Sequence, residues 1–150
     1  MEAESYADET TSKFIDENFV PVQAHIKKHP GYFHRFGVLW TPTVVVLDSD
    51  GAERARSEGY LPNAEFRARL ELALARIAFM RKDWTEAEKR YAETAEKFAR
   101  TSAAAQAVYW RGVSRYKATG DRKELSRVAE ELKRKYPGSL WTVKASIWSP

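Results

Sequence analysis

The chain has 150 residues, 43% hydrophobic and 13% aromatic, which suits one compact domain or two small ones and argues against global disorder. Its 25 basic and 21 acidic side chains give a net charge of +4, and their alternation in sign favours solvated helix faces over a nucleic-acid-binding patch. Cysteine is absent, which excludes disulfides, thiol nucleophiles and cysteine metal sites in this chain. No apolar run approaches the ~20 residues of a membrane span, and no signal peptide is recognised, so the cytoplasm is the default expectation.

Residues 1–61 are predicted to form a mixed α and β region. An acidic first turn and apolar residues on one side predict a short helix over residues 8–19. Residues 20–26 place apolar side chains at every second position, which predicts a strand, and Pro21 confines it to a strand start or an exposed edge. A short helical turn is expected over residues 29–37.

A hairpin is predicted next. The β-branched run TVVVL at residues 43–47 predicts a strand that is buried on both faces. Residues 48–51, Asp-Ser-Asp-Gly, predict a tight turn in which Gly51 takes a positive φ. Residues 52–58 are charged and are predicted to return as an edge strand.

The rest of the chain is predicted to be helical. A long helix over residues 62–81 is shared between the two regions, and helices follow over residues 84–98, after Thr101, after Gly120 and over residues 139–148. The pattern repeats after 38 residues, from Asp83 to Asp121 and from Phe98 to Tyr136. Residues 82–87 with Tyr91, and residues 109–112 with Tyr116, Gly120, Asp121 and Pro137, resemble tetratricopeptide repeats. Plain antiparallel helical hairpins are the alternative.

The order of elements up to Tyr60 resembles the second half of a thioredoxin-fold domain, and this resemblance covers residues 8 to about 75. It rests on NFVPVQAHI (residues 18–26), followed by FGVLWTPTVVVLDSDG (residues 36–51), which in particular resembles bacterial thioredoxin-like proteins with a helical tail. The resemblance implies that Pro42 is cis and that a peptide-binding loop forms from Trp40, Thr41, Pro42, Gly59 and Tyr60. Thr41 would offer its backbone to an extended partner. The fold class expected is therefore a partial thioredoxin-like sheet with flanking helices (α+β, residues 1–61), followed by an all-α tail of helical hairpins (residues 62–150).

Members of that family carry Trp-Cys-x-x-Cys just before the point that Met1 to Tyr6 would match. Without cysteine this chain has no thiolate for dithiol exchange. Two functions stay open. The chain is a redox-inactive module that binds a protein or peptide, or the full gene product is a thiol–disulfide oxidoreductase whose motif is encoded upstream of Met1. In both, this chain is interpreted as part of a larger thioredoxin-family protein or as a remnant of one.

The strand that precedes that motif in the family lies in the middle of the sheet, between the strands that match residues 20–26 and 43–47. Its absence would leave two inner edges without hydrogen-bonding partners. We therefore expect either that the remaining strands pair directly or that a second copy completes the sheet as a homodimer.

Two further sets of residues are candidates for a metal site and for a binding groove. His25, His29 and His34 lie close in sequence but straddle different elements, so a zinc site is disfavoured and no metal or cofactor is expected. Tyr109, Trp110, Arg111 and Arg115 are candidates for lining a groove of the helical pairs, because aromatics and arginine are favoured at interface hot spots. Helix packing is the favoured role of Trp110 itself. Neither a nucleic acid nor a membrane is expected as a partner.

Overall fold

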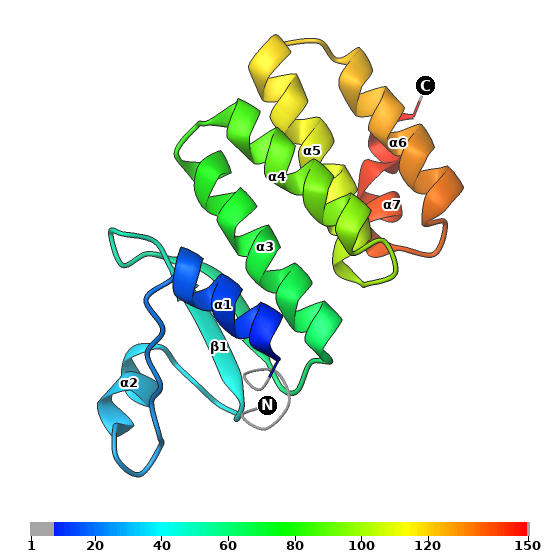
Figure 1. Ribbon diagram of the computed structural model, residues 1–150. Helices are drawn as coiled ribbons and strands as arrows, with labels where there is room; N and C mark the ends of the chain where they lie inside the picture. Colours follow the sequence, from blue (N-terminus) through cyan, green and yellow to red (C-terminus); the bar gives the residue numbers. More distant parts are fainter. Residues whose placement is uncertain (1–7, 150) are drawn as a thin grey trace. The chain divides into compact units, whose positions relative to one another are not determined.

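The computed structural model describes residues 8–149, and the chain divides into two compact units, residues 1–66 and residues 67–150. The boundary falls inside one long helix, α3 (Asn63–Met80), which begins directly after Pro62. Within the described range no helix is both long enough and apolar enough to cross a membrane. Figure 1 draws the first unit in blue to cyan-green and the second in green to red.

The first unit begins with α1 (Glu9–Asn18), whose start and position are fixed by side-chain hydrogen bonds. The carboxylate of Asp8 accepts hydrogen bonds from the backbone N–H of Thr11 at 2.8 Å and from its hydroxyl at 2.6 Å, which caps the helix. The same hydroxyl lies 3.1 Å from Oδ1 of Asn63. The apolar side of α1 places Phe14 and Ile15 among the buried residues, as the amphipathic pattern predicted.

The sheet of this unit consists of β1 (Thr43–Leu47) and β2 (Glu53–Glu58), which pair antiparallel. Thr43 lies opposite Glu58, and a bulge falls between Val46 and Leu47. The carboxylate of Asp48 accepts hydrogen bonds from the backbone N–H groups of residues 50 and 52, at 3.0 and 3.1 Å, and so closes the turn. Gly51 has a φ of 77°, so the predicted hairpin and its glycine are confirmed.

The strand predicted over residues 20–26 is wrong. No strand forms there, and the side chains of Val20, Val22 and Ile26 are 91%, 72% and 54% exposed. Alternating apolar residues make a strand only where a neighbouring strand supplies hydrogen bonds and a cover, and within residues 8–149 β1 pairs with β2 alone. Direct pairing of this segment with β1 is therefore also wrong, and β1 is not buried on both faces, since only Val46 is fully buried.

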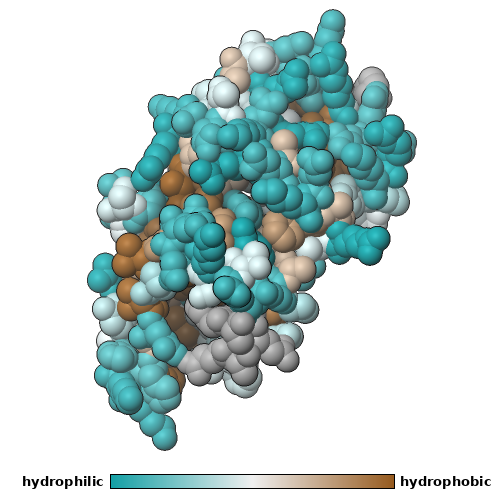
Figure 2. Space-filling model, in the orientation of Figure 1, coloured by the Kyte–Doolittle hydropathy of each residue, from teal (hydrophilic) through white to brown (hydrophobic). Residues whose placement is uncertain are grey.

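These exposed residues contribute to an apolar surface on the first unit. Hydrophobic residues gather at the lower left of Figure 2, the area in which Figure 1 draws the segment joining α1 to α2 (Pro30–Arg35). Leu39 and Trp40, which follow α2, are exposed as well, at 88% and 70%. An exposed apolar area of this kind typically marks a surface that another chain or segment covers.

The second unit is helical, as predicted, and consecutive helices run antiparallel in Figure 1. After the end of α3 come α4 (Trp84–Lys97), α5 (Ala103–Thr119), α6 (Lys123–Lys135), α7 (Leu140–Ala145) and a 3-10 turn, η1 (Ser146–Trp148). Asp83 caps α4 by accepting a hydrogen bond from the backbone N–H of Glu86 at 3.1 Å. Gly120, with a φ of 74°, ends α5.

Two apolar clusters hold these helices together. The first joins the C-terminal part of α3 to α4 and α5 around Tyr91, which is 2% exposed. The second joins α5 to α6 and α7 around Val108 and Leu132. The 38-residue period reappears in both helical pairs, because Phe98 ends α4 and Tyr136 ends α6, each donating its backbone N–H to a carbonyl four residues earlier.

Candidate functional site

The first candidate surface is the loop at the start of β1, which brings together all five residues predicted for it. The Thr41–Pro42 bond is cis, as the resemblance implied. The carbonyl of Pro42 accepts a hydrogen bond from the backbone N–H of Gly59 at 2.8 Å, and Gly59 has a φ of 83°. This contact holds the end of β2 against the loop, so Tyr60 is positioned beside it.

Aromatic side chains of this loop are open to solvent. Trp40 is 70% exposed and Tyr60 is 54% exposed. The hydroxyl of Thr43 donates to the carbonyl of Trp40 at 2.6 Å, which fixes the turn into β1. Among residues 8–149, no hydrogen bond engages the backbone N–H or carbonyl of Thr41, so these groups are available to a ligand.

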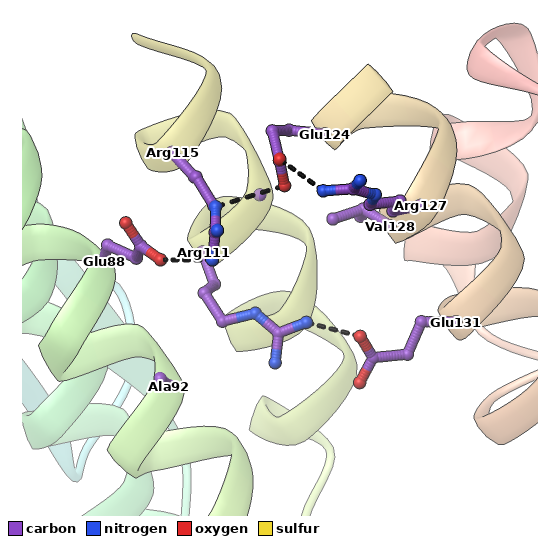
Figure 3. A pocket seen from close by; sticks show the side chains of 9 residues that line it. Glu88, Ala92, Arg111, Arg115, Glu124, Arg127, Val128 and Glu131 are labelled. Carbon is purple, nitrogen blue, oxygen red and sulfur yellow. Dashed lines mark hydrogen bonds and ion pairs between the residues drawn. The ribbon is translucent and has the colours of Figure 1, made fainter. Parts of the chain in front are cut away.

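The second candidate surface is a groove of about 400 Å³ between α4, α5 and α6 (Figure 3). Small residues of its lining include Gly112 of α5 and Val128 of α6. Its walls carry three arginines and three glutamates, namely Arg111, Arg115, Arg127, Glu88, Glu124 and Glu131. The groove is therefore strongly polar and electrically balanced.

The charges of the groove form two connected sets. In the first, Arg111 of α5 reaches across to Glu131 of α6, whose other oxygen accepts from Nζ of Lys135 at 2.8 Å. Burial by itself raises the pKa of Glu131, but the hydrogen bonds from Lys135 and Arg111 outweigh it, so that this pKa lies below its ordinary value. The carboxylate is thus held in its charged form.

The second set is centred on Glu124, whose side chain is only 12% exposed. It accepts from Nε of Arg115 at 3.2 Å and from a terminal nitrogen of Arg127 at 2.6 Å. Arg115 also lies 3.4 Å from Glu88 of α4, so one guanidinium bridges three helices (Figure 3). The contact with Glu88 is the longest of these pairs and the easiest for an incoming carboxylate to replace.

Residues 1–74 match the family model of the thioredoxin-like domain. Over these residues the chain is similar to a thioredoxin-like domain. The match covers the loop surface just described and the hairpin that carries it, and it supports the resemblance drawn from the sequence at the family level. No curated protein and no solved structure matches the chain.

Outside the thioredoxin-like segment, the structure separates the four residues predicted for a helical groove. Arg111 and Arg115 line the groove, whereas Tyr109 and Trp110 lie in a row of ring contacts that does not border it. The ring of Trp110 packs against Phe79 at 5.1 Å between centroids, and the ring of Tyr109 stacks on Trp148 at 4.7 Å. Trp110 also packs against the first apolar cluster, which agrees with the packing role favoured for it.

The glutamates of the groove were not among the residues singled out in the sequence. A signal for them exists, because Glu124, Val128 and Glu131 are spaced by four and three residues and so share one face of α6. Predicting which arginines these glutamates contact requires the rotation of α5 relative to α6. Residue spacing within one helix does not determine that rotation.

No group of three or more metal-binding side chains occurs within the described range of the chain. Two of the three histidines of the thioredoxin-like segment, His25 and His29, take part in local hydrogen bonds. The backbone N–H of His25 donates to Nδ1 of His29 at 3.2 Å, and Nδ1 of His25 accepts from the backbone N–H of Lys27 at 3.2 Å.

Proposed function

We propose that the protein is a binding module for a protein or peptide partner, without thiol–disulfide activity of its own. The observation that carries this proposal is the groove between α4, α5 and α6, which gathers Arg111 and Arg115 beside three glutamates. Arginine is enriched among the residues that dominate binding energy at interfaces. The lack of cysteine supports the redox-inactive part of the proposal, since dithiol exchange needs a thiolate.

The helical pairs are proposed to be tetratricopeptide-like. Their support is the 38-residue period with matched helix ends at Phe98 and Tyr136, and the close approach of α5 to α6 at Gly112. A Cβ at Gly112 would overlap the side chain of Val128, so only glycine fits this crossing. Stacked helical pairs of this kind typically present grooves to extended peptides.

The test is binding of the full chain to an array of short peptides of varied charge. The double variant Arg111→Gln and Arg115→Gln is expected to lose the peptides that the wild type retains, because peptide carboxylates then lack their bidentate partners. The matched control is Arg100→Gln, which removes an exposed arginine outside the groove. Circular dichroism establishes that both variants keep their helices. Equal retention by all three proteins would contradict the groove as the binding surface.

The loop of Trp40, Thr41 and Pro42 is proposed as a second contact surface, on which an extended peptide pairs with the open backbone of Thr41. Trp40 supplies an exposed ring for apolar side chains of that peptide. On the same array, Trp40→Ala removes this contribution without touching the groove, so the two surfaces are distinguished by which peptides each variant loses.

A second candidate function follows from the match to the thioredoxin-like domain. In it, the full gene product is a thiol–disulfide oxidoreductase whose Cys-x-x-Cys motif is encoded upstream of Met1. The deciding observation is the transcript and the DNA before that codon. An in-frame Trp-Cys-x-x-Cys that follows a strand pattern supports this candidate, and an in-frame stop codon there removes it.

A further inference from the structure

α7 and η1 carry apolar residues on two different sides. One side is packed, since Ala145 is fully buried in the cluster shared with α5 and α6, and Trp141 and Trp148 pack against that cluster. The other side is open. It carries Leu140, Val143 and Ile147, which are 64%, 66% and 82% exposed. Their spacing of three and four residues places them on one helix face, and we refer to these three residues as the α7 stripe.

The period of the helical pairs indicates what kind of element would cover this stripe. In the two complete pairs, α3 is followed by α4 and α5 is followed by α6, and each pair packs through an apolar cluster. A shift of 38 residues places Val143 where Ala105 lies in α5, and Ile147 where Tyr109 lies. Ala105 is 5% exposed and shares a cluster with Val128, Ala129 and Leu132 of α6. The buried position of Ala105 therefore corresponds to an open position, Val143, on α7, whereas Tyr109, the counterpart of Ile147, packs against Trp141 and Trp148.

We propose that the α7 stripe binds an amphipathic α-helix of a partner, which lies against α7 as α6 lies against α5. A helix suits this surface because the stripe is itself a helical ridge, and helices pack by placing ridges into grooves. The charge beside the stripe is positive, since Lys144 is the one charged side chain in residues 137–149. The partner helix therefore carries acidic residues beside its apolar face.

The chain supplies a suitable probe, the segment of residues 83–98 that forms α4. As a synthetic peptide it presents Trp84, Ala87 and Tyr91 on one face and has more acidic than basic side chains. The peptide is labelled with a fluorophore, and its anisotropy is followed as the full-length protein is added. The same peptide with Tyr91→Asp serves as the control probe, because it keeps the length but loses the centre of the apolar face.

The double variant Val143→Asp and Ile147→Asp is expected to weaken binding of the peptide at least about tenfold, since each charge would be buried against an apolar face. Both residues are exposed in the free protein, so its helix content and unfolding midpoint should stay unchanged. Met80→Asp is the matched variant, because Met80 is another exposed apolar residue of the helical unit, outside the stripe. It should bind the peptide as the wild type does.

Equal affinity of the wild type and the double variant for the peptide would overturn the proposal. So would a wild-type protein that is dimeric by itself and becomes monomeric on Val143→Asp and Ile147→Asp, because the stripe is then covered by a second copy. The Arg111→Gln and Arg115→Gln variant is expected to bind the α4 peptide normally. Failure of the groove and failure of the stripe are thereby separate results.

Discussion

The ion pairs in the groove depend on single side chains that face each other across α5 and α6. Glu131 accepts from Arg111 of α5 and from Lys135 of its own helix, and its side chain is 18% exposed. These partners stabilise the charged carboxylate more than burial destabilises it, which is why its pKa is lowered.

A lowered pKa in the folded state makes stability depend on pH in a defined direction. The contribution of Glu131 is present above the carboxyl's ordinary value of 4.5 and is lost as the pH falls through the lower folded-state pKa. Glu131→Gln should therefore reduce the free energy of unfolding at neutral pH by about 0.2–1 kcal/mol, and this difference should vanish in acid. Urea unfolding of both proteins at neutral and acidic pH measures it.

Glu130→Gln is the control for this experiment, because Glu130 is an exposed neighbour on the same helix. Its unfolding free energy should follow that of the wild type at every pH. A difference between wild type and Glu131→Gln that stays constant down to acidic pH would show that ionisation of Glu131 contributes nothing.

Sequence spacing predicts which groove residues share a face of one helix, but it does not predict which residues of other helices they contact. Arg111 and Arg115 stand one helical turn apart, so their common face was predictable from sequence alone. Their partners Glu88, Glu124 and Glu131 come from two other helices. Which carboxylate meets which guanidinium depends on helix rotation and crossing, and these are fixed by the apolar contacts of whole helices.

At the scale of elements, the crossing of α5 and α6 depends on the lack of a side chain at Gly112. A Cβ built there lies 3.0 Å from Cβ of Val128 and overlaps one of its methyl groups. Gly112→Ala gains up to about 1 kcal/mol of helix propensity, but overpacking typically costs about 1–3 kcal/mol. We therefore expect a net loss of stability, measured as a lower urea midpoint.

A second substitution tests whether the contact with Val128 is the cause. Adding Val128→Ala to Gly112→Ala makes room for the new methyl group, so the double variant should be more stable than the sum of the two single effects. Gly138→Ala is the control, because no atom lies within 4 Å of its built Cβ. If Gly112→Ala matches or exceeds the wild type in stability, the helices can separate at no cost.

The same scale explains which elements were predictable from sequence. A helix forms its hydrogen bonds within its own segment, and capping residues mark its ends, such as Asp83 before α4 and Gly120 after α5. The helices were therefore found where the sequence predicted them. The hairpin was also predicted correctly, because its turn residues, 48–51, determine the turn without contacts from distant parts of the chain. The segment of residues 20–26 has the alternation of a strand but no strand beside it, so its local pattern could not decide its structure.

At the scale of the whole molecule, the thioredoxin-like unit presents an incomplete sheet. Within residues 8–149, β1 has one neighbour, β2, so its other edge has backbone groups without strand partners. Near it in sequence stand two exposed apolar segments, residues 20–26 and residues 39–40. A strand edge that no other strand covers, and a segment of alternating apolar residues that lies outside any strand, could pair with each other between two copies of the chain.

We therefore expect the chain to self-associate through this unit. Its weight-average mass in sedimentation equilibrium should exceed the 17.2 kDa of one chain and rise with concentration. Val20→Lys with Val22→Lys should lower that mass towards one chain, because charged residues on a pairing segment oppose edge-to-edge association. Val143→Asp with Ile147→Asp should leave it unchanged, which separates this interface from the α7 stripe. A mass of one chain at every concentration would mean that the open edge of β1 is not used for pairing between copies.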